Sequence, residues 1–358
     1  MSKIMHFERC VMIWIQNTHL RNYQNRIARD SLKCHSTQSH ITSDEKKEIE
    51  KVWGGLGFRG NVDWHCLYKT INGFDPFYVP TDIYGTEIIH RLNQQNLLAA
   101  WDEKAYYPRF FPEINKPRMI GLRIDGQFYD GDYKIVSPKV MERILLEEKR
   151  VIVKPSDGME GRGIEIWDTN EVDLKKKLES YSSNFVIQEV LVQHDSLGSL
   201  NKSSINPIRV MTLRLNGKIK YLHSIVRFGT PGSITDVSFA NGKELIQASS
   251  VSREGIINSS YFDADGIKRP RSKLMGGECK LQIPNFDKVI QMGMEIHNGL
   301  HHFDLVGSDI TVDKNGTPIM IEYNVFWPGP IFPQYCNGPL FGEYSEELIE
   351  TLKKRAKK

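Results

Sequence analysis

Residues 307–324 read GSDITVDKNGTPIMIEYN, and this pattern predicts a β-hairpin with acidic side chains on one face. An Asn-Gly pair, here at 315–316, is a strong signal for a two-residue turn between antiparallel strands. With that turn, Asp309 lies directly opposite Glu322, and Ile310 lies opposite Ile321. Side chains alternate across a strand, so the hairpin has two distinct faces. The apolar face comprises Ile310, Val312, Ile319 and Ile321, and the polar face comprises Asp309, Thr311, Met320, Glu322 and Asn324.

The opposed acidic residues predict a metal site. Like charges directly opposite each other destabilise a sheet, so Asp309 and Glu322 need a compensating cation or full solvation. Two carboxylates and the amide oxygen of Asn324 are ligands that a hard divalent cation prefers. We therefore expect one or two Mg²⁺ ions at Asp309, Glu322 and Asn324, with Mn²⁺ as an alternative. The other interpretation is a solvated face without a metal, and Pro318 and other turn lengths leave the register open.

A glycine-rich loop follows a short buried strand at 151–153 and precedes a second strand at 164–167. Its residues 154–163 read KPSDGMEGRG, and Gly158, Gly161 and Gly163 would let backbone N–H groups approach phosphate oxygens closely. Lys154 ends the first strand, where its ammonium group can meet a phosphate. The spacing fits neither a P-loop nor the dinucleotide fingerprint that opens a helix. The loop is typical of a phosphate-binding flap, although glycine-rich hairpins are commonly structural.

The remaining pattern mixes helices with antiparallel hairpins, which favours an α+β fold. Helices are expected within residues 1–60, where Thr42 and Glu45 form a capping-box pattern, at 171–180, at 285–298 and from 346 onward. A further strand is expected at 185–189. Asn216-Gly217 predicts a tight hairpin between strands at 208–215 and 219–226.

Composition narrows the class of protein. The 358 residues suggest about two domains, and 40% hydrophobic with 25% charged residues exclude a disordered chain. A net charge of +3 gives no support for nucleic-acid binding. The five scattered cysteines, without a CxxC pair, favour neither disulfides nor zinc and fit a reducing compartment. No apolar run approaches the length of a membrane span, so we expect a soluble, cytoplasmic protein.

Six blocks of sequence, taken in order, resemble the ATP-grasp superfamily. They are Asp102-Glu103-Lys104, residues 151–155, the Gly158–Gly163 loop, residues 186–191, residues 206–212, and Asp309 with Glu322-Tyr323-Asn324. More narrowly, the chain resembles the ATP-grasp proteins associated with sugar transfer in polysaccharide biosynthesis. The match covers about residues 100–330. Two departures are an extra residue in Asp102-Glu103-Lys104, where Asp-Lys is expected, and the segment 236–242.

The resemblance implies an ATP-grasp fold, in which two α+β subdomains clasp ATP. The N-terminal residues 1–100 would form a mainly helical accessory segment. Residues 101–190 would form the first subdomain with the phosphate flap, and residues 191–358 the second subdomain with the metal site.

The resemblance also implies roles for single residues. Lys104 and Lys154 would bind the nucleotide phosphates, and Gly158, Gly161 and Gly163 would cover them. The backbone of Glu189, Val190 and Leu191 would meet adenine, and Asp195 would bind the ribose. Lys154 and Arg209 would be catalytic, with Arg209 on the transferring phosphoryl group or acyl phosphate. Asp309, Glu322 and Asn324 match the metal-binding triad, and Arg209 and Arg227 are candidate substrate contacts.

The implied activity is ligation of a carboxylate to an amine or hydroxyl group through an acyl phosphate. ATP and Mg²⁺ would be the cofactors, and the substrates would be small molecules, one of them a sugar or glycan precursor. Two alternatives are a kinase of the same fold and a non-catalytic nucleotide-binding module of a biosynthetic complex. No nucleic-acid partner is expected, and the sequence does not indicate the oligomeric state.

Overall fold

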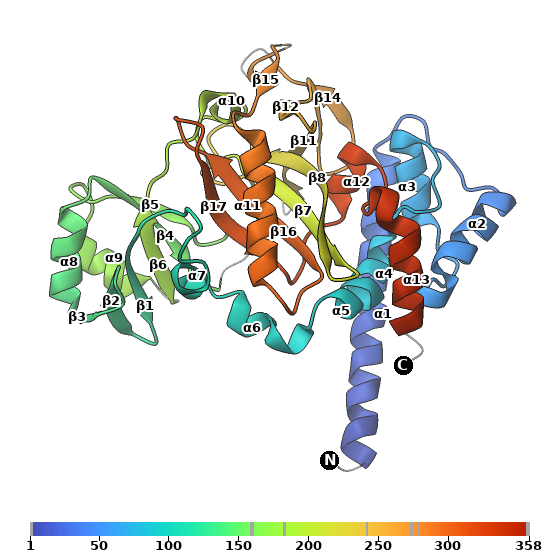
Figure 1. The fold of residues 1–358 in the computed structure, drawn as a ribbon, viewed down its shortest axis with the longest axis horizontal. Coiled ribbons are helices and arrows are strands. Elements are labelled where there is room, and N and C mark those ends of the chain that lie inside the picture. Colours follow the sequence, from blue (N-terminus) through green and yellow to red (C-terminus); the bar gives the residue numbers. More distant parts are fainter. Residues whose placement is uncertain are drawn as a thin grey trace.

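The computed structural model describes residues 3–157, 161–181, 184–240, 243–272, 275–277 and 279–355. Two antiparallel sheets lie next to each other, and helices cover their faces (Figure 1). The α+β class predicted from the sequence is therefore correct. The division of the chain at residues 100 and 190 remains a prediction.

The first sheet runs in the order β3-β2-β1-β6-β4-β5. Its strands are β1 (Met119–Ile124), β2 (Gln127–Asp130), β3 (Ile135–Val136), β4 (Arg150–Pro155), β5 (Glu165–Asp168) and β6 (Phe185–Glu189). Helices α8 (Pro138–Leu146) and α9 (Leu174–Ser180) pack on one face, over Val151 and Val153. The next residue, Lys154, pairs with Val186, so both side chains lie on the opposite face. That face also receives Ala105, which directly follows Lys104.

The larger sheet runs in the order β14-β13-β11-β8-β7-β16-β17, and β12 and β15 extend it at β11. Its strands are β7 (Ile208–Leu215), β8 (Lys218–Phe228), β11 (Gln247–Val251), β12 (Ile256–Ile257), β13 (Ser260–Phe262), β14 (Lys268–Pro270), β15 (Leu281–Gln282), β16 (Leu305–Val312) and β17 (Pro318–Asn324). A separate pair is formed by β9 (Ser238–Ala240) and β10 (Lys243–Leu245).

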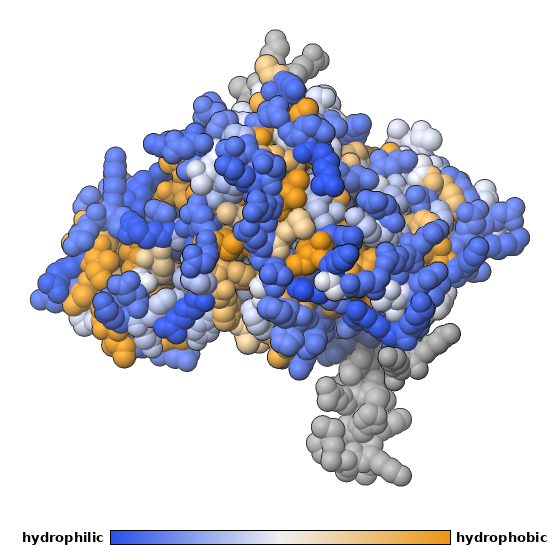
Figure 2. Space-filling model, in the orientation of Figure 1, coloured by the Kyte–Doolittle hydropathy of each residue, from blue (hydrophilic) through white to orange (hydrophobic). Residues whose placement is uncertain are grey.

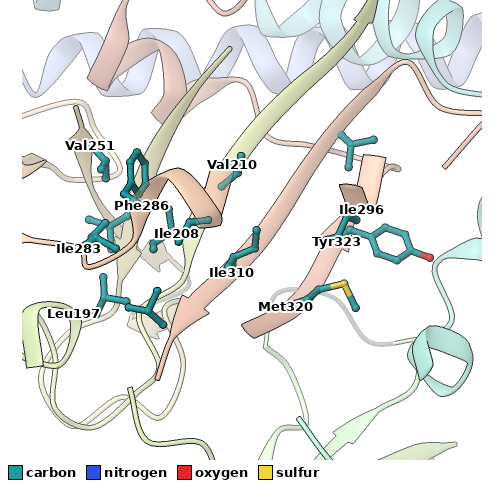
Figure 3. Close-up of a cluster of buried hydrophobic side chains, with 14 of the residues drawn as sticks. Leu197, Ile208, Val210, Val251, Ile283, Phe286, Ile296, Ile310, Met320 and Tyr323 are labelled. Carbon is teal, nitrogen blue, oxygen red and sulfur yellow. The ribbon is translucent and has the colours of Figure 1, made fainter. Parts of the chain in front are cut away.

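Helix α11 (Phe286–Gly299) lies across β7, β16 and β17 on one face of this sheet (Figure 1). Alternate residues of β7, Ile208 and Val210, join Val289 and Ile296 of α11 in the largest core cluster (Figure 3). The intervening residues Arg209, Met211 and Leu213 must therefore face away from α11.

The N-terminal helices cover that second face. Ile83, Tyr84 and Ile88 pack against Met211 and Leu213 of β7. The helices here are α1 (Lys3–Lys33), α2 (Ser43–Trp53), η1 (Gly54–Leu56), α3 (Asp63–Asn72), α4 (Thr81–Ile83), the π-helix η2 (Tyr84–Ile88) and α5 (Ile89–Leu92). The next two, η3 (Gln95–Leu97) and α6 (Leu98–Trp101), pack instead against the core cluster on the α11 side. The predicted capping box at Thr42 and Glu45 is present. Figure 1 shows α1 extending beyond the body of the molecule at its N-terminal end.

Short helices complete the chain. They are η4 (Lys104–Tyr106), α7 (Tyr107–Phe110), α10 (Asp195–Gly198), α12 (Ile331–Asn337), η6 (Gly342–Tyr344) and α13 (Ser345–Arg355). Helix α12 contacts β8 and β11, on the side of the sheet away from α11. The surface in Figure 2 is largely hydrophilic, with apolar residues in scattered patches. Within the described residues, no helix is long and apolar enough to cross a membrane.

Two buried histidines predict a loss of stability below neutral pH. Burial lowers the pKa of His65 to about 4, and burial with the nearby charge of Arg214 lowers the pKa of His297 to about 3. The unfolded chain, with histidine pKa values near 6.5, therefore takes up protons first as the pH falls. Above about pH 6.5, neither histidine lowers the free energy of unfolding. Below that pH, each histidine lowers it by about 1.4 kcal/mol per pH unit, until the pH reaches the pKa of that histidine in the folded protein.

A His297→Gln variant tests this expectation. The His297 ring lies within hydrogen-bond distance of Thr212 Oγ1 (2.7 Å) and the Phe303 carbonyl (3.0 Å), and glutamine has groups for both without titrating. In urea unfolding at pH 7.5 and pH 5, the variant should lose less free energy of unfolding than the parent protein does. An equal loss in both proteins would show that His297 does not contribute.

Candidate functional site

The β16–β17 hairpin brings the predicted acidic residues together. Asp309 pairs with Glu322, and Gly307 pairs with Asn324, as the sequence register requires. The turn differs from the prediction, because three residues, 314–316, form the loop, with Gly316 in the left-handed region at φ +81°. The Asp313 carboxylate favours this wider loop, since it accepts hydrogen bonds from the backbone N–H groups of Asn315 and Thr317, both at 2.8 Å.

A β-bulge at Ile321 restores the predicted pairing of Asp309 with Glu322, which the wider turn alone would shift by one residue. Ile310 lies opposite Met320 rather than Ile321, so that part of the predicted register is wrong. Met320 packs in the core with Ile310 (Figure 3), whereas the prediction placed it on the acidic face. Ile319 pairs with Thr311 and therefore shares the face of Asp309, again contrary to prediction. The wider turn and the bulge each shift the register by one residue, and the two shifts cancel at Asp309. Bulges of this kind are common near functional sites.

Arg209 and Asp309 form a buried, two-bonded ion pair. They lie opposite each other on β7 and β16, and their side chains are only 6% and 3% exposed. The Arg209 guanidinium donates from Nε to Asp309 Oδ1 at 2.5 Å and from Nη2 to Oδ2 at 2.7 Å. Burial alone would raise the pKa of the Asp309 carboxyl, but Arg209 outweighs it and holds that pKa below its usual value. Asn324 also donates to Asp309 Oδ2, at 3.4 Å.

The two predicted nucleotide lysines meet next to this hairpin. The backbone N–H of Lys104 donates to the Ser156 carbonyl at 3.0 Å, which fixes η4 to the end of β4. Lys104 Nζ lies 3.8 Å from Glu322 Oε2, so η4, which is bonded to the end of β4, contacts the hairpin of the second sheet. Burial, with the like charge of Lys104, lowers the pKa of Lys154 to about 8, while Glu322 opposes the shift. Burial and two neighbouring carboxylates raise the pKa of Asp102 to about 6, although Lys104 opposes this.

The donor set fits a magnesium ion by its chemistry. Asp309, Glu322 and Asn324 project from the same face of the hairpin and offer two carboxylates and an amide oxygen. Arg209 donates one hydrogen bond to each oxygen of Asp309, and each carboxylate oxygen keeps a second lone pair that can bind a metal. Among the described residues, no group of three or more His, Cys, Asp or Glu side chains is arranged so that it could hold a metal ion. The metal role of these three residues remains a prediction.

The glycine-rich loop joins β4 and β5, which pair antiparallel, as expected for a flap. Gly158 lies outside the described residues. Gly161 and Gly163 have φ of +69° and +73°, and the Tyr181 hydroxyl donates to the Gly163 carbonyl. A Cβ on Gly161 would lie 3.0 Å from Thr235 Cγ2, so the flap reaches the loop that follows β8. Gly161 of the flap therefore lies against a loop that follows an interior strand of the second sheet.

Replacing Gly163 with alanine should weaken ADP binding about tenfold or more, the effect of losing one good phosphate contact. The new Cβ would lie 2.9 Å from Pro155 Cγ, directly after Lys154, and would displace the flap. Gly217→Ala is the matched control, because Gly217 also has φ +73° but has no atom within 4 Å of the new Cβ. Calorimetric titration with ADP and Mg²⁺ measures both variants, and similar affinities for the two would contradict this role for the flap.

The predicted adenine hinge leads from β6 toward the acidic hairpin. Glu189 ends β6, and its backbone N–H and its carboxylate both bond to the backbone of Arg118. Val190 and Leu191 follow, and the His194 backbone N–H then donates to the Val312 carbonyl of β16 at 2.9 Å. The predicted ribose ligand Asp195 begins α10 and is exposed. The hinge thus runs past the end of β16, and the nucleotide roles of these residues remain predictions.

Arg227 on β8 lies on the same side of the sheet as Arg209 and is paired with Asp236. Burial opposes its charge, but Asp236, Asp309 and Glu322 together raise the pKa of Arg227. Within the described part of the chain, its buried Nε has no hydrogen-bond partner. Arg227 therefore retains a donor for an anionic ligand, which is consistent with its predicted role as a substrate contact. Asp236 lies in the segment that departs from the family pattern, and its pairing with Arg227 gives that departure a structural role.

Sequence reasoning missed two contributors to this region. Thr235, which contacts the flap, and Tyr84, which lies near Arg209, carry no motif that could have identified them. Both come from loops or helices whose position depends on long-range packing.

A family model described as sugar-transfer associated ATP-grasp matches residues 85–345. The chain belongs to this family. Its α+β architecture is the ATP-grasp fold, and the helices before residue 85 precede the family region. The resemblance inferred from the six sequence blocks is therefore confirmed.

Solved structures with a similar fold are distant in sequence. The ATP-grasp ligase PsnB complexed with a minimal precursor is 13% identical, with a TM-score of 0.43, over 72% of this chain and 63% of PsnB. D-alanine–D-alanine ligase from Bacillus anthracis is 16% identical, with a TM-score of 0.41, over 74% and 70%. D-alanyl-alanine synthetase A from Vibrio cholerae is 12% identical, with a TM-score of 0.44, over 72% and 66%.

The chain spans about three fifths of the length of PsnB, which has also been solved with Mg and ADP. Among proteins of curated function, none matches the chain.

Proposed function

We propose that this ATP-grasp protein is an ATP-dependent ligase that joins a carboxylate to an amine or hydroxyl group through an acyl phosphate. The single observation that carries the proposal is the meeting of Lys104, Lys154 and Glu322 next to the Arg209–Asp309 pair. Cations and carboxylates from both sheets thus converge where a nucleotide triphosphate and its metal would be held. Membership of the sugar-transfer associated family supports a sugar or glycan precursor as one substrate.

In the proposed reaction, a carboxylate oxygen of the first substrate attacks the γ-phosphorus of ATP. The bond between that phosphorus and the bridging oxygen breaks, and ADP leaves. The amine or hydroxyl of the second substrate then attacks the acyl carbon, loses its proton, and displaces inorganic phosphate. ATP supplies the driving force, so no other co-reactant is needed.

The positively charged and the acidic residues of the site would have different roles in this reaction. Lys104 and Lys154 would bind the phosphates, and the N–H groups of Arg209 and Arg227 would orient the transferring phosphoryl group and the substrate carboxylate. Asp309, Glu322 and Asn324 would hold Mg²⁺, which when bound neutralises negative charge on phosphate oxygens. Because the guanidinium and ammonium groups are fixed before the reaction, they stabilise developing charge without reorganisation.

A phosphate-release screen tests the proposal. Mg-ATP is incubated with pairs drawn from a panel of carboxylates, including amino acids, and a panel of nucleotide sugars and amino sugars. A ligase releases inorganic phosphate only when both substrates are present. Phosphate that stays on a single substrate would identify a kinase instead, and nucleotide binding without any turnover would indicate a non-catalytic nucleotide-binding module.

A further inference from the structure

The N-terminal helices reach the candidate site through the π-helix η2. Tyr84, its first residue, is fully buried and packs with Met211 on the face of β7 that carries Arg209. Short π-helical turns are uncommon and are found frequently at functional sites. This turn is therefore a candidate for more than a structural role.

Tyr84 and Gly85 hold the segment that follows Asn324. The Tyr84 ring meets Trp327 edge-on, with centroids 5.1 Å apart and planes at 90°. A Cβ on Gly85 would lie 2.7 Å from Trp327 Cζ3 and 2.8 Å from Cη2. Gly85 has no positive φ that would require glycine, so close packing against the indole is the reason for glycine at this position.

The residue after Trp327 in turn holds Arg209. The Pro328 carbonyl accepts a hydrogen bond from Arg209 Nη1 at 3.3 Å, on the side of the guanidinium not engaged by Asp309. A Cβ on Gly307 would lie 2.8 Å from Arg209 Cδ and 3.3 Å from the Pro328 carbonyl oxygen. The Arg209 side chain therefore occupies a narrow slot, and Pro328 forms one of its walls.

The Tyr84 hydroxyl lies within the electric field of the same guanidinium. Burial raises the pKa of Tyr84 well above its usual value, and the charge of Arg209 opposes that rise. In the described part of the chain, the buried Tyr84 hydroxyl has no hydrogen-bond partner. A buried donor of this kind calls for an explanation beyond packing.

We propose that η2 is a positioning element for Arg209, in which Tyr84 and Gly85 fix Trp327 and Pro328, and Pro328 fixes the guanidinium. The N-terminal helices would then set how Arg209 meets the γ-phosphate of a bound nucleotide. This inference rests on the proposed function, because it assumes that Arg209 contacts that phosphate.

The ratio of two affinities isolates the Arg209 contact without requiring a known substrate. Binding of ADP and of a non-hydrolysable ATP analogue is measured by calorimetry with Mg²⁺, and the preference for the analogue reports contacts to the γ-phosphate. Arg209→Lys, which keeps the charge but not the forked geometry, should largely remove the preference. Gly85→Ala should reduce it by roughly three- to tenfold, the size typical of a residue that acts through another.

Two further variants separate positioning from general destabilisation. Gly54→Ala is the matched control, because its new Cβ has no atom within 4 Å, and its preference should equal that of the parent protein. Trp327→Phe lacks the outer ring edge that the Gly85→Ala methyl group would strike, so the double variant should regain most of the preference. A merely structural defect would weaken ADP and the analogue equally and leave their ratio unchanged.

The outcomes distinguish the two proposals. If the parent protein binds neither nucleotide, the proposed function fails. If it binds both without a preference for the analogue, Arg209 does not contact the γ-phosphate and the inference about η2 fails. If the parent protein shows the preference and Arg209→Lys loses it, but Gly85→Ala retains it in full, then η2 does not position Arg209. Loss in Gly85→Ala with recovery in the double variant supports the inference.

Discussion

Replacing Arg209 with methionine is expected to lower the free energy of unfolding by about 3–5 kcal/mol. The change leaves the Asp309 carboxylate, which is only 3% exposed, without its buried counter-ion. An uncompensated buried charge costs far more than the ion pair itself contributes, because desolvation is no longer offset. Urea unfolding at pH 7.5 measures the loss.

Two comparisons make this result specific. The double variant Arg209→Met with Asp309→Leu removes both charges and should recover most of the lost free energy, since an apolar pair can replace a buried ion pair. Arg150→Met breaks the Arg150–Asp168 pair, whose side chains are about half exposed, and should cost only about 0–1 kcal/mol. If Arg209→Met were no more destabilising than Arg150→Met, the buried pair would not have the strength that its geometry indicates.

Replacing Lys154 with methionine should abolish ATP-dependent turnover and weaken ADP binding by about 10- to 100-fold, the contribution of a hydrogen bond to a charged group. The same change should leave the free energy of unfolding unaltered or higher. Burial and the neighbouring Lys104 already disfavour the charge of Lys154 when no phosphate is present, as its lowered pKa of about 8 indicates. The charged Lys154 would thus lower the free energy of unfolding of the nucleotide-free protein and strengthen the binding of the nucleotide.

Lys177→Met is the control for this prediction. Lys177 lies on α9 over the same sheet and pairs with Glu165, but it is partly exposed and faces away from the site. Calorimetric titration with ADP and Mg²⁺, together with urea unfolding, measures both variants. Unchanged ADP affinity in Lys154→Met would remove Lys154 from the nucleotide site.

Short-range signals in the sequence predicted much of the fold. Asn216-Gly217 forms the expected tight turn with both residues at positive φ, and the strand at 185–189 coincides with β6. The β1–β2 hairpin was missed, although Asp125-Gly126 carries the same type of turn signal. The pairing of Asp309 with Glu322 was correct because two one-residue deviations cancelled, which no local pattern reveals.

Short-range sequence signals did not predict which distant residues pair with each other. Arg209 and Asp309 are one hundred residues apart, and their ion pair depends on β7 and β16 being neighbours in the sheet. The sequence predicted both residues as functional but not that they bind each other. The position of Tyr84 near Arg209 likewise depends on how the N-terminal helices pack on β7.

Transfer of ¹⁸O from a labelled substrate carboxylate to inorganic phosphate tests the central claim most directly. The acyl phosphate mechanism places one carboxylate oxygen between carbon and phosphorus, and that oxygen leaves with the phosphate. With a substrate pair that supports phosphate release, mass spectrometry should therefore find one ¹⁸O atom in each phosphate formed. Unlabelled phosphate, or label retained entirely in the product, would contradict carboxylate activation by this protein.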